Sequence, residues 1–231
     1  RSRLDDPSLS LESRRAVELM VGDVGRLRRL IEDLLEISRM DSGAEELRVE
    51  EFDVAAFLQQ VSQARGWPRQ VELRIDPAES GIPVATDRRR LERIVVNLVE
   101  NGLRHGAPPI WVDARVVHDP GGGESQFALD VTDHGAGIPP EHLSEVFQRF
   151  YKADPSRTSS GGAGSGLGLA IAWENARLLG GLLRVKSNVG EGTRFSLRIP
   201  VTQPLRQRET PVIPGAQNDS TGFLQEEADN E

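Results

Sequence analysis

The chain has 231 residues, enough for one medium-sized domain plus an extra element, and its 28 Lys and Arg against 36 Asp and Glu give a formal net charge of −8. This balance offers no overall attraction to nucleic acid or to an anionic membrane, so we expect no direct contact with either. The lack of cysteine excludes disulfides and thiolate metal sites and suits a reducing cytoplasm, and no stretch approaches the roughly 20 apolar residues of a membrane span.

Residues 12 to about 40 predict one long helix with a narrow apolar seam. The seam residues follow the alternating spacing of four and three that is typical of a coiled coil: Met20, Val24, Leu27, Ile31 and Leu34. A helix with such a seam needs an apolar partner. We interpret it as a bundle or dimerisation helix, with packing on its own domain as the alternative.

After Gly43 the pattern changes to mixed strands and helices. The sequence predicts strands over 49–52, 71–75, 110–117, 127–132, 182–187 and 194–200 and helices over 53–65, 88–105, 141–150 and 167–179. Asp53 and Asp87 can cap the first two of these helices. This mixture favours an α+β fold, a two-layer sandwich with helices over one face of a mixed sheet.

Three regions follow from this reading. Residues 1–43 form the long helix, 44–202 the sandwich, and 203–231 a tail in which prolines and an acidic run replace apolar periodicity. We expect the tail to be disordered.

A first polar segment lies on the helix predicted for residues 88–105. Asn97, Asn101 and Arg104 fall on one face, opposite an apolar stripe. Amide oxygens suit Mg²⁺, and an arginine can hold phosphate oxygens. Taken alone, a solvated polar face explains these residues better.

A second segment, Asp133 to Ile138, directly follows a strand. Gly135 and Gly137 permit a tight turn and close approach to a flat ligand. The Asp133 carboxylate could accept a hydrogen bond from an exocyclic amine such as that of adenine. An ordinary strand-end turn is the alternative.

A third segment runs from Phe147 to Lys152. Phe147 and Phe150 could anchor it in the core, which would leave Arg149 and Lys152 to reach phosphates. Ordinary surface cations at a helix end are the alternative.

In a fourth segment, Gly164, Gly166 and Gly168 open a helix. Backbone N–H groups at a helix N-terminus bind phosphate. The segment is neither a Walker loop nor a dinucleotide fingerprint, and a glycine-rich linker is the alternative.

In this order, the four segments and the turn at Gly190–Thr193 resemble the N, G1, F, G2 and G3 boxes of histidine kinases. Those proteins share their fold with gyrase, Hsp90 and MutL. The resemblance covers about residues 45–200, and the helix before it resembles the second helix of the family's dimerisation and phosphotransfer hairpin.

The resemblance implies a role for each matching residue. Asn101 would bind Mg²⁺, with Asn97 and Arg104 near the phosphates of ATP. Residues 153–165 would form a lid over the nucleotide. The residues implied to contact ATP are Asp133, Gly135, Gly137, Arg149, Lys152, Gly164, Gly166, Leu167, Gly168 and Thr193, with Asp133 accepting from adenine.

The family's phosphorylated histidine is missing, because none of the four histidines lies in its motif. We therefore expect a fragment or shortened gene product, the ATP-binding part of a sensor histidine kinase. It would phosphorylate a histidine outside this chain, pass the phosphoryl group to a response regulator, and dimerise through the N-terminal helix. The expected location is the cytoplasm, with a parent protein anchored in the bacterial membrane.

Two alternatives stay open: a non-enzymatic ATP-binding module and a serine kinase of the anti-sigma type. The missing histidine favours the first, and the long helix argues against the second. Hydrolases that resemble this family carry Glu where this chain has Asn97, and an amide cannot take a proton from water. We therefore expect phosphoryl transfer rather than hydrolysis.

Overall fold

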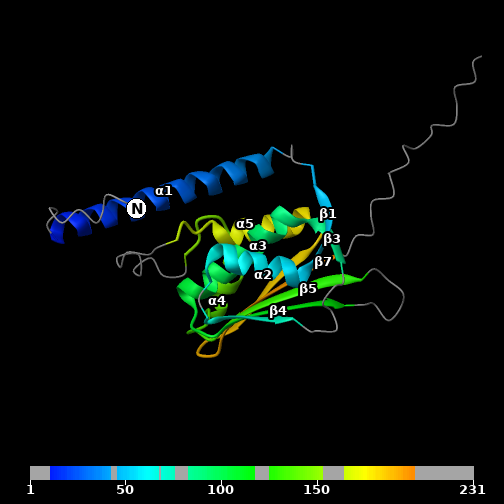
Figure 1. Cartoon of the computed structure of the whole chain (residues 1–231). Coiled ribbons are helices and arrows are strands. Elements are labelled where there is room, and N and C mark those ends of the chain that lie inside the picture. Colours follow the sequence, from blue (N-terminus) through cyan, green and yellow to red (C-terminus); the bar gives the residue numbers. More distant parts are fainter. Residues whose placement is uncertain are drawn as a thin grey trace, which may run out of the picture.

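The structure is a computed structural model that describes residues 11–42, 46–67, 69–75, 83–117, 125–152 and 164–200. The long helix α1 (Leu11–Asp41) runs beside a body of helices and strands, and its N-terminal half extends past that body (Figure 1). None of the described helices is long and apolar enough to cross a membrane.

A mixed sheet of five strands forms one layer of the body, in the order β2-β4-β5-β7-β6. The strands are β2 (Val71–Ile75), β4 (Ile110–Val117), β5 (Gln126–Asp133), β6 (Leu182–Asn188) and β7 (Gly192–Pro200). β2 runs parallel to β4, and the other neighbours are antiparallel. Helices α2 (Val54–Arg65), α3 (Arg88–His105) and α5 (Gly168–Leu178) cover one face (Figure 1). The predicted α+β sandwich is confirmed.

A second, two-stranded sheet joins α1 to the body. β1 (Val49–Asp53) pairs antiparallel with β3 (Pro83–Asp87). Strand β3 was not predicted from the sequence. Val84 to Asp87 are all buried, so the alternation of exposed and buried residues that reveals a strand is missing there.

The two predicted helix caps are both present. Asp53 Oδ1 accepts a hydrogen bond from Ala56 N at 2.6 Å, and Asp87 Oδ1 accepts from the N–H groups of Arg89 and Arg90 at the start of α3. Asp87 Oδ2 also accepts from Arg48 N at 3.0 Å. One carboxylate therefore fixes the start of α3 and the entry of β1.

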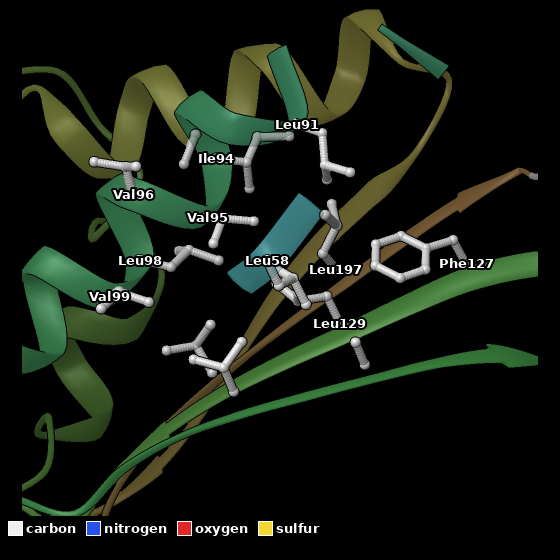
Figure 2. Close-up of a cluster of buried hydrophobic side chains, with 14 of the residues drawn as sticks. Leu58, Leu91, Ile94, Val95, Val96, Leu98, Val99, Phe127, Leu129 and Leu197 are labelled. Carbon is white, nitrogen blue, oxygen red and sulfur yellow. The ribbon is translucent and has the colours of Figure 1, made fainter. Parts of the chain in front are cut away.

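The core lies between α3 and the sheet. Figure 2 shows the apolar stripe of α3 facing Leu58 of α2 and side chains of β5 and β7. The stripe residues Leu91, Ile94, Val95, Leu98 and Val99 are fully buried. Burial of each such side chain is worth about 1.5–3 kcal/mol, so packing holds α3 in place and leaves its polar face free to form a site.

The seam of α1 stays exposed in the single chain. Met20, Val24, Leu27, Ile31 and Leu34 keep between 43% and 67% of their surface. A different residue of α1, Ile37, is buried against Leu167 and Ile171. The predicted partner for the seam is therefore not found among the described residues, which leaves dimerisation a prediction.

Two expectations for residues 141–150 were wrong. Helix α4 (Pro140–Leu143) is one turn long, and turns follow it as far as Phe150. Phe150 is 59% exposed rather than anchored in the core, and its φ of 65° lies in the left-handed region that a helix cannot use. Residues 153–163 of the expected lid and the predicted tail at 203–231 lie outside the described residues.

Candidate nucleotide-binding site

The polar face of α3 meets the glycine segment at the start of α5. A Cβ atom at Gly168 would lie 3.2 Å from Asn97 Oδ1, so these two boxes are in contact. Asn97 Nδ2 is buried and has no hydrogen-bond partner among the described residues. A buried amide without a partner is costly in a folded protein, and a ligand with acceptor oxygens would satisfy it.

Arg104 lies seven residues after Asn97, on the same face of α3. A Cβ atom at Gly164 would be 2.7 Å from its Nη1 atom, so Arg104 covers the beginning of the glycine segment. Glu100 lies 4.0 Å from its Nη2 atom, a loose and half-exposed pair. Asn101, which lies between Asn97 and Arg104 in the sequence, is half-buried. The structure thus places Asn97 beside Gly168 and Arg104 beside Gly164.

Asp133 ends β5 with a buried side chain. Its Oδ1 atom accepts a hydrogen bond from Gly135 N at 2.8 Å. Burial raises the pKa of Asp133 above its ordinary value, while the N–H groups of Gly135 and Thr193 and the nearby His134 oppose that rise. A buried carboxylate that can accept further hydrogen bonds is suited to bind an amino group of a flat ligand.

Gly106, directly after α3, was not predicted as a site residue. A Cβ atom there would lie 2.4 Å from Asp133 Cγ, and one at Gly135 would lie 2.6 Å from Gly106 Cα. These two glycines therefore create the space in which the carboxylate sits. The sequence signal that could have revealed Gly106 is a glycine directly after a helix that carries predicted site residues.

The turn between β6 and β7 holds the Asp133 loop in place. Gly137 has a φ of 74°, and a Cβ atom there would lie 2.1 Å from Asn188 O. Ser187 Oγ accepts from Ile138 N at 2.8 Å and lies 2.9 Å from Thr193 Oγ1. Thr193 thus belongs to the site, through its N–H to Asp133 and its contact with Ser187.

The third segment contacts the glycine segment through its backbone. Phe150 N donates to Gly166 O at 2.9 Å, and a Cβ atom at Gly166, whose φ is 72°, would lie 2.8 Å from Phe150 C. Phe147 is half-buried and packs edge-on against Phe195, with ring centroids 6.2 Å apart. The left-handed backbone at Phe150 therefore lies at the point where the third segment approaches Gly166 closely.

Three further predicted ligand residues differ in the surroundings of their side chains. The Arg149 guanidinium binds the Asp41 carboxylate at the end of α1, with distances of 2.8 and 2.6 Å. The Leu167 side chain is buried against α1, which leaves only its backbone for a ligand. Lys152 is exposed, next to residues outside the described part.

The described histidines are engaged in local contacts. His134 Nδ1 lies 2.9 Å from Pro109 O, and its ring meets Trp111 edge-on. His142 Nδ1 lies 2.6 Å from the Tyr151 hydroxyl. No group of three or more His, Cys, Asp or Glu side chains within the described ranges could hold a metal.

This geometry agrees with the comparison with known proteins. Residues 86–203 match the family described as histidine kinase-, DNA gyrase B-, and HSP90-like ATPase. The chain belongs to this family. Asn97, Asp133 and the glycine segment all lie within the residues matched to this ATPase family.

Among curated members, the signal transduction histidine-protein kinase AfsQ2 of Streptomyces coelicolor is 41% identical over 186 residues, covering 80% of this chain and 32% of that protein. The sensor histidine kinase MtrB of Mycobacterium tuberculosis is 39% identical over 212 residues, with 90% and 35% covered. The chain therefore spans about a third of the length of these relatives.

Solved histidine kinases have the same fold. The Acinetobacter baumannii histidine kinase AdeS superposes with a TM-score of 0.63 at 25% identity, over 81% of this chain and 84% of that chain. Full-length ShkA in complex with AMPPNP gives 0.65 at 25% identity, over 89% of this chain and 42% of that chain.

Proposed function

We propose that this chain is the ATP-binding catalytic part of a sensor histidine kinase. It would bind Mg·ATP and transfer the γ-phosphate to a histidine outside this chain, from which a response regulator takes it. The observation that carries the proposal is that α3 joins two halves of one site. Asn97 meets Gly168 at one point of the helix, and Gly106 meets Asp133 nine residues later, about 13 Å along the axis. A nucleoside triphosphate has a comparable length.

In this proposal each half recognises one end of ATP. The Asp133 carboxylate accepts a hydrogen bond from the adenine amino group, in the space left by Gly106 and Gly135. Asn97 Nδ2 and the N–H groups at the start of α5 donate to phosphate oxygens. Arg104 adds a positive charge beside Gly164. ShkA was crystallised with the ATP analogue AMPPNP, which supports a nucleotide at this site.

Asn101 is the proposed protein ligand of Mg²⁺. Its half-buried position on the same helix as Asn97 and Arg104 supports this role. When bound, Mg²⁺ would neutralise charge on the phosphate oxygens. The described residues that approach the phosphates would then only orient them and exclude water.

Phosphoryl transfer fits these side chains better than hydrolysis does. A hydrolase needs a base to activate water, and Asn97 cannot accept a proton at neutral pH. The nearest carboxylate on α3, Glu100, faces Arg104 at 4.0 Å. Glu92, the other carboxylate of α3, pairs with Arg65 at 3.2 Å.

The remaining assignments belong to the same proposal. Residues 153–165 would form the lid, and 1–43 would form the second helix of a dimerisation hairpin, through the exposed seam of α1. The matched relatives are sensor kinases, which supports a response-regulator partner and a cytoplasmic domain of a membrane-anchored parent.

Nucleotide titration tests the binding half of the proposal. The chain should bind Mg·ATP, and Asn101→Ala should abolish the Mg²⁺-dependent part of the affinity without changing the circular dichroism spectrum. If Asn101→Ala binds Mg·ATP normally, the metal assignment is wrong.

A radiolabelled-ATP assay tests transfer. The chain alone should not become labelled, and an added hairpin that carries a phosphorylatable histidine should acquire acid-labile phosphate. If the chain binds ATP and the hairpin stays unlabelled, the non-enzymatic ATP-binding alternative holds. Acid-labile label on the chain alone would show that an internal histidine is the acceptor.

A further inference from the structure

Three carboxylates on the C-terminal third of α1 face the ATPase body. Asp33, Glu36 and Asp41 together form what we call the acidic strip. Each of them makes at least one hydrogen bond to a side chain of the body. The strip lies beside Ile37, which is the residue of α1 that is buried against α5. The acidic strip and Ile37 therefore form the surface through which α1 docks.

The inner part of the strip is held by a network. Arg93 of α3 donates to Glu36 Oε2 at 2.7 Å and also binds Asp33. Glu36 Oε1 accepts from Asn175 Nδ2 of α5 at 3.0 Å. The side chains of Arg93, Asp33 and Glu36 are at most about a quarter exposed, and Asn175 is fully buried. The contacts of Asp33 and Glu36 are therefore more buried than the contact between Asp41 and Arg149 at the other end of the docking surface.

Two contacts of the strip fall on segments assigned to nucleotide phosphates. Asp33 Oδ2 accepts from Ser165 Oγ at 3.2 Å, within the glycine segment. The Asp41 carboxylate accepts hydrogen bonds from both terminal nitrogens, Nη1 and Nη2, of the Arg149 guanidinium. Docked α1 thus places a carboxylate near the segment that would hold anionic phosphates and neutralises a cation that would attract them. Both effects oppose phosphate binding.

We propose that Asp41, at the end of the acidic strip, competes with the nucleotide phosphates for Arg149, so that docking of the Asp41 end of α1 and binding of ATP weaken each other. The inference rests on the proposed nucleotide site. Because such coupling is reciprocal, a bound nucleotide loosens the Asp41 end of α1 to the same extent that docked α1 weakens the nucleotide.

The exposure of this pair makes the exchange feasible. The side chains of Arg149 and Asp41 are 38% and 55% exposed, and an exposed ion pair contributes little to stability. Phosphate offers arginine the same bidentate geometry with more negative charge. Arg149 can therefore change partner while Arg93, Asn175 and Ile37 keep the rest of α1 in place.

The first test measures the affinity of the full chain for Mg·AMPPNP by calorimetry. Asp41→Asn should raise this affinity roughly twofold to fivefold, as expected for the loss of one exposed ion pair. Asp23→Asn is the matched control, because Asp23 is an exposed carboxylate of α1 whose partner is Arg26 on the same helix. That control should leave the affinity unchanged. An unchanged affinity in Asp41→Asn overturns the inference.

The second test asks whether Arg149 and the phosphates carry the effect. In an Arg149→Ala background, Asp41→Asn should change nothing. Adenosine, which has no phosphate, should bind the original chain and Asp41→Asn equally. An equal gain for adenosine would mean that Asp41 acts on the fold and not on phosphate, against the inference. If the original chain binds no Mg·AMPPNP, the proposed function fails instead, which separates the two failures.

Discussion

Gly106 touches the carboxyl group of Asp133 so closely that a Cβ atom at residue 106 would lie 2.4 Å from Cγ and 2.5 Å from Oδ1. Only a residue without a side chain fits between the end of α3 and the end of β5. The position of the buried carboxylate thus depends on a backbone atom of another element.

Gly106→Ala should therefore impair the site more than the fold. The methyl group must push the Asp133 side chain aside, which we expect to cost about 1–3 kcal/mol of unfolding free energy and at least about tenfold in ATP affinity. Denaturant unfolding and nucleotide titration measure the two effects. Gly22→Ala is the control, since nothing lies within 4 Å of a Cβ atom there, and it should leave ATP affinity unchanged. A Gly106→Ala protein with normal ATP affinity would contradict the assignment of Asp133.

The free energy of unfolding should respond differently to alanine at Asn175, which is buried, and at Asn97, which is half-buried. Asn175 binds Arg90, Glu36 and the carbonyl of Ile171, so Asn175→Ala should lose about 1–3 kcal/mol of stability through the groups left unpaired. Asn97 Nδ2 has no such partner among the described residues. Asn97→Ala should keep the unfolding free energy of the nucleotide-free chain and lose nucleotide affinity. Equal destabilisation by both changes would show that Asn97 is a structural residue.

Asp133→Asn should stabilise the nucleotide-free chain at neutral pH. Burial raises the pKa of Asp133 in the folded state, so the ionised side chain opposes folding, and this penalty disappears as the pH falls through that raised pKa. Asparagine keeps an acceptor for the N–H groups of Gly135 and Thr193. The gain in thermal midpoint over the original chain should shrink on acidification. A gain that grows with falling pH would contradict the raised pKa.

The same substitution should relax the preference for ATP over GTP. A carboxylate accepts from the amino group of adenine but meets the carbonyl oxygen of guanine, a repulsive contact. An asparagine side chain can turn its amide to donate instead. Competition between the two nucleotides for the original chain and for Asp133→Asn measures the preference. Equal binding of ATP and GTP by the original chain would exclude Asp133 as the adenine contact.

The Asp41 carboxyl should titrate below the ordinary range. The hydrogen bond from Arg149 lowers its pKa, so the pair is formed above the ordinary pKa and is lost as the pH falls through the lowered value. Arg149→Ala should raise the pKa of Asp41 back to the ordinary range of an exposed carboxyl group. Carboxyl NMR titration of the original chain and of Arg149→Ala measures this change. An Asp41 pKa that Arg149→Ala leaves unchanged would mean that the pair is not populated in solution.

Local chemistry explains what the sequence could predict. Asp53 and Asp87 cap helices through atoms a few residues away, and the stripe of α3 follows from helical spacing. The glycines of the site were recognised because their spacing resembles that of a known family. These features depend on neighbours in the chain, so a pattern can reveal them.

The features that were missed depend on distant partners. Asp41 and Arg149 are 108 residues apart, and nothing near Arg149 indicates that a helix end will compete for it. The helix predicted for 141–150 ends at Leu143, and Phe150 instead approaches Gly166 in a left-handed conformation. Gly106 looks like an ordinary helix end until Asp133 is placed beside it.

Helices α2 and α3 share one hydrophobic core, and this determines the smallest piece of the chain that can fold by itself. Phe57, Leu58 and Val61 of α2 are at most 4% exposed and belong to the same cluster as α3 and the sheet. The family match begins only at residue 86. A truncation cut at that boundary would strip one wall from the cluster, remove β1, β2 and most of β3, and aggregate. The autonomous folding unit begins at β1 or earlier, about 40 residues before the recognisable ATPase signature.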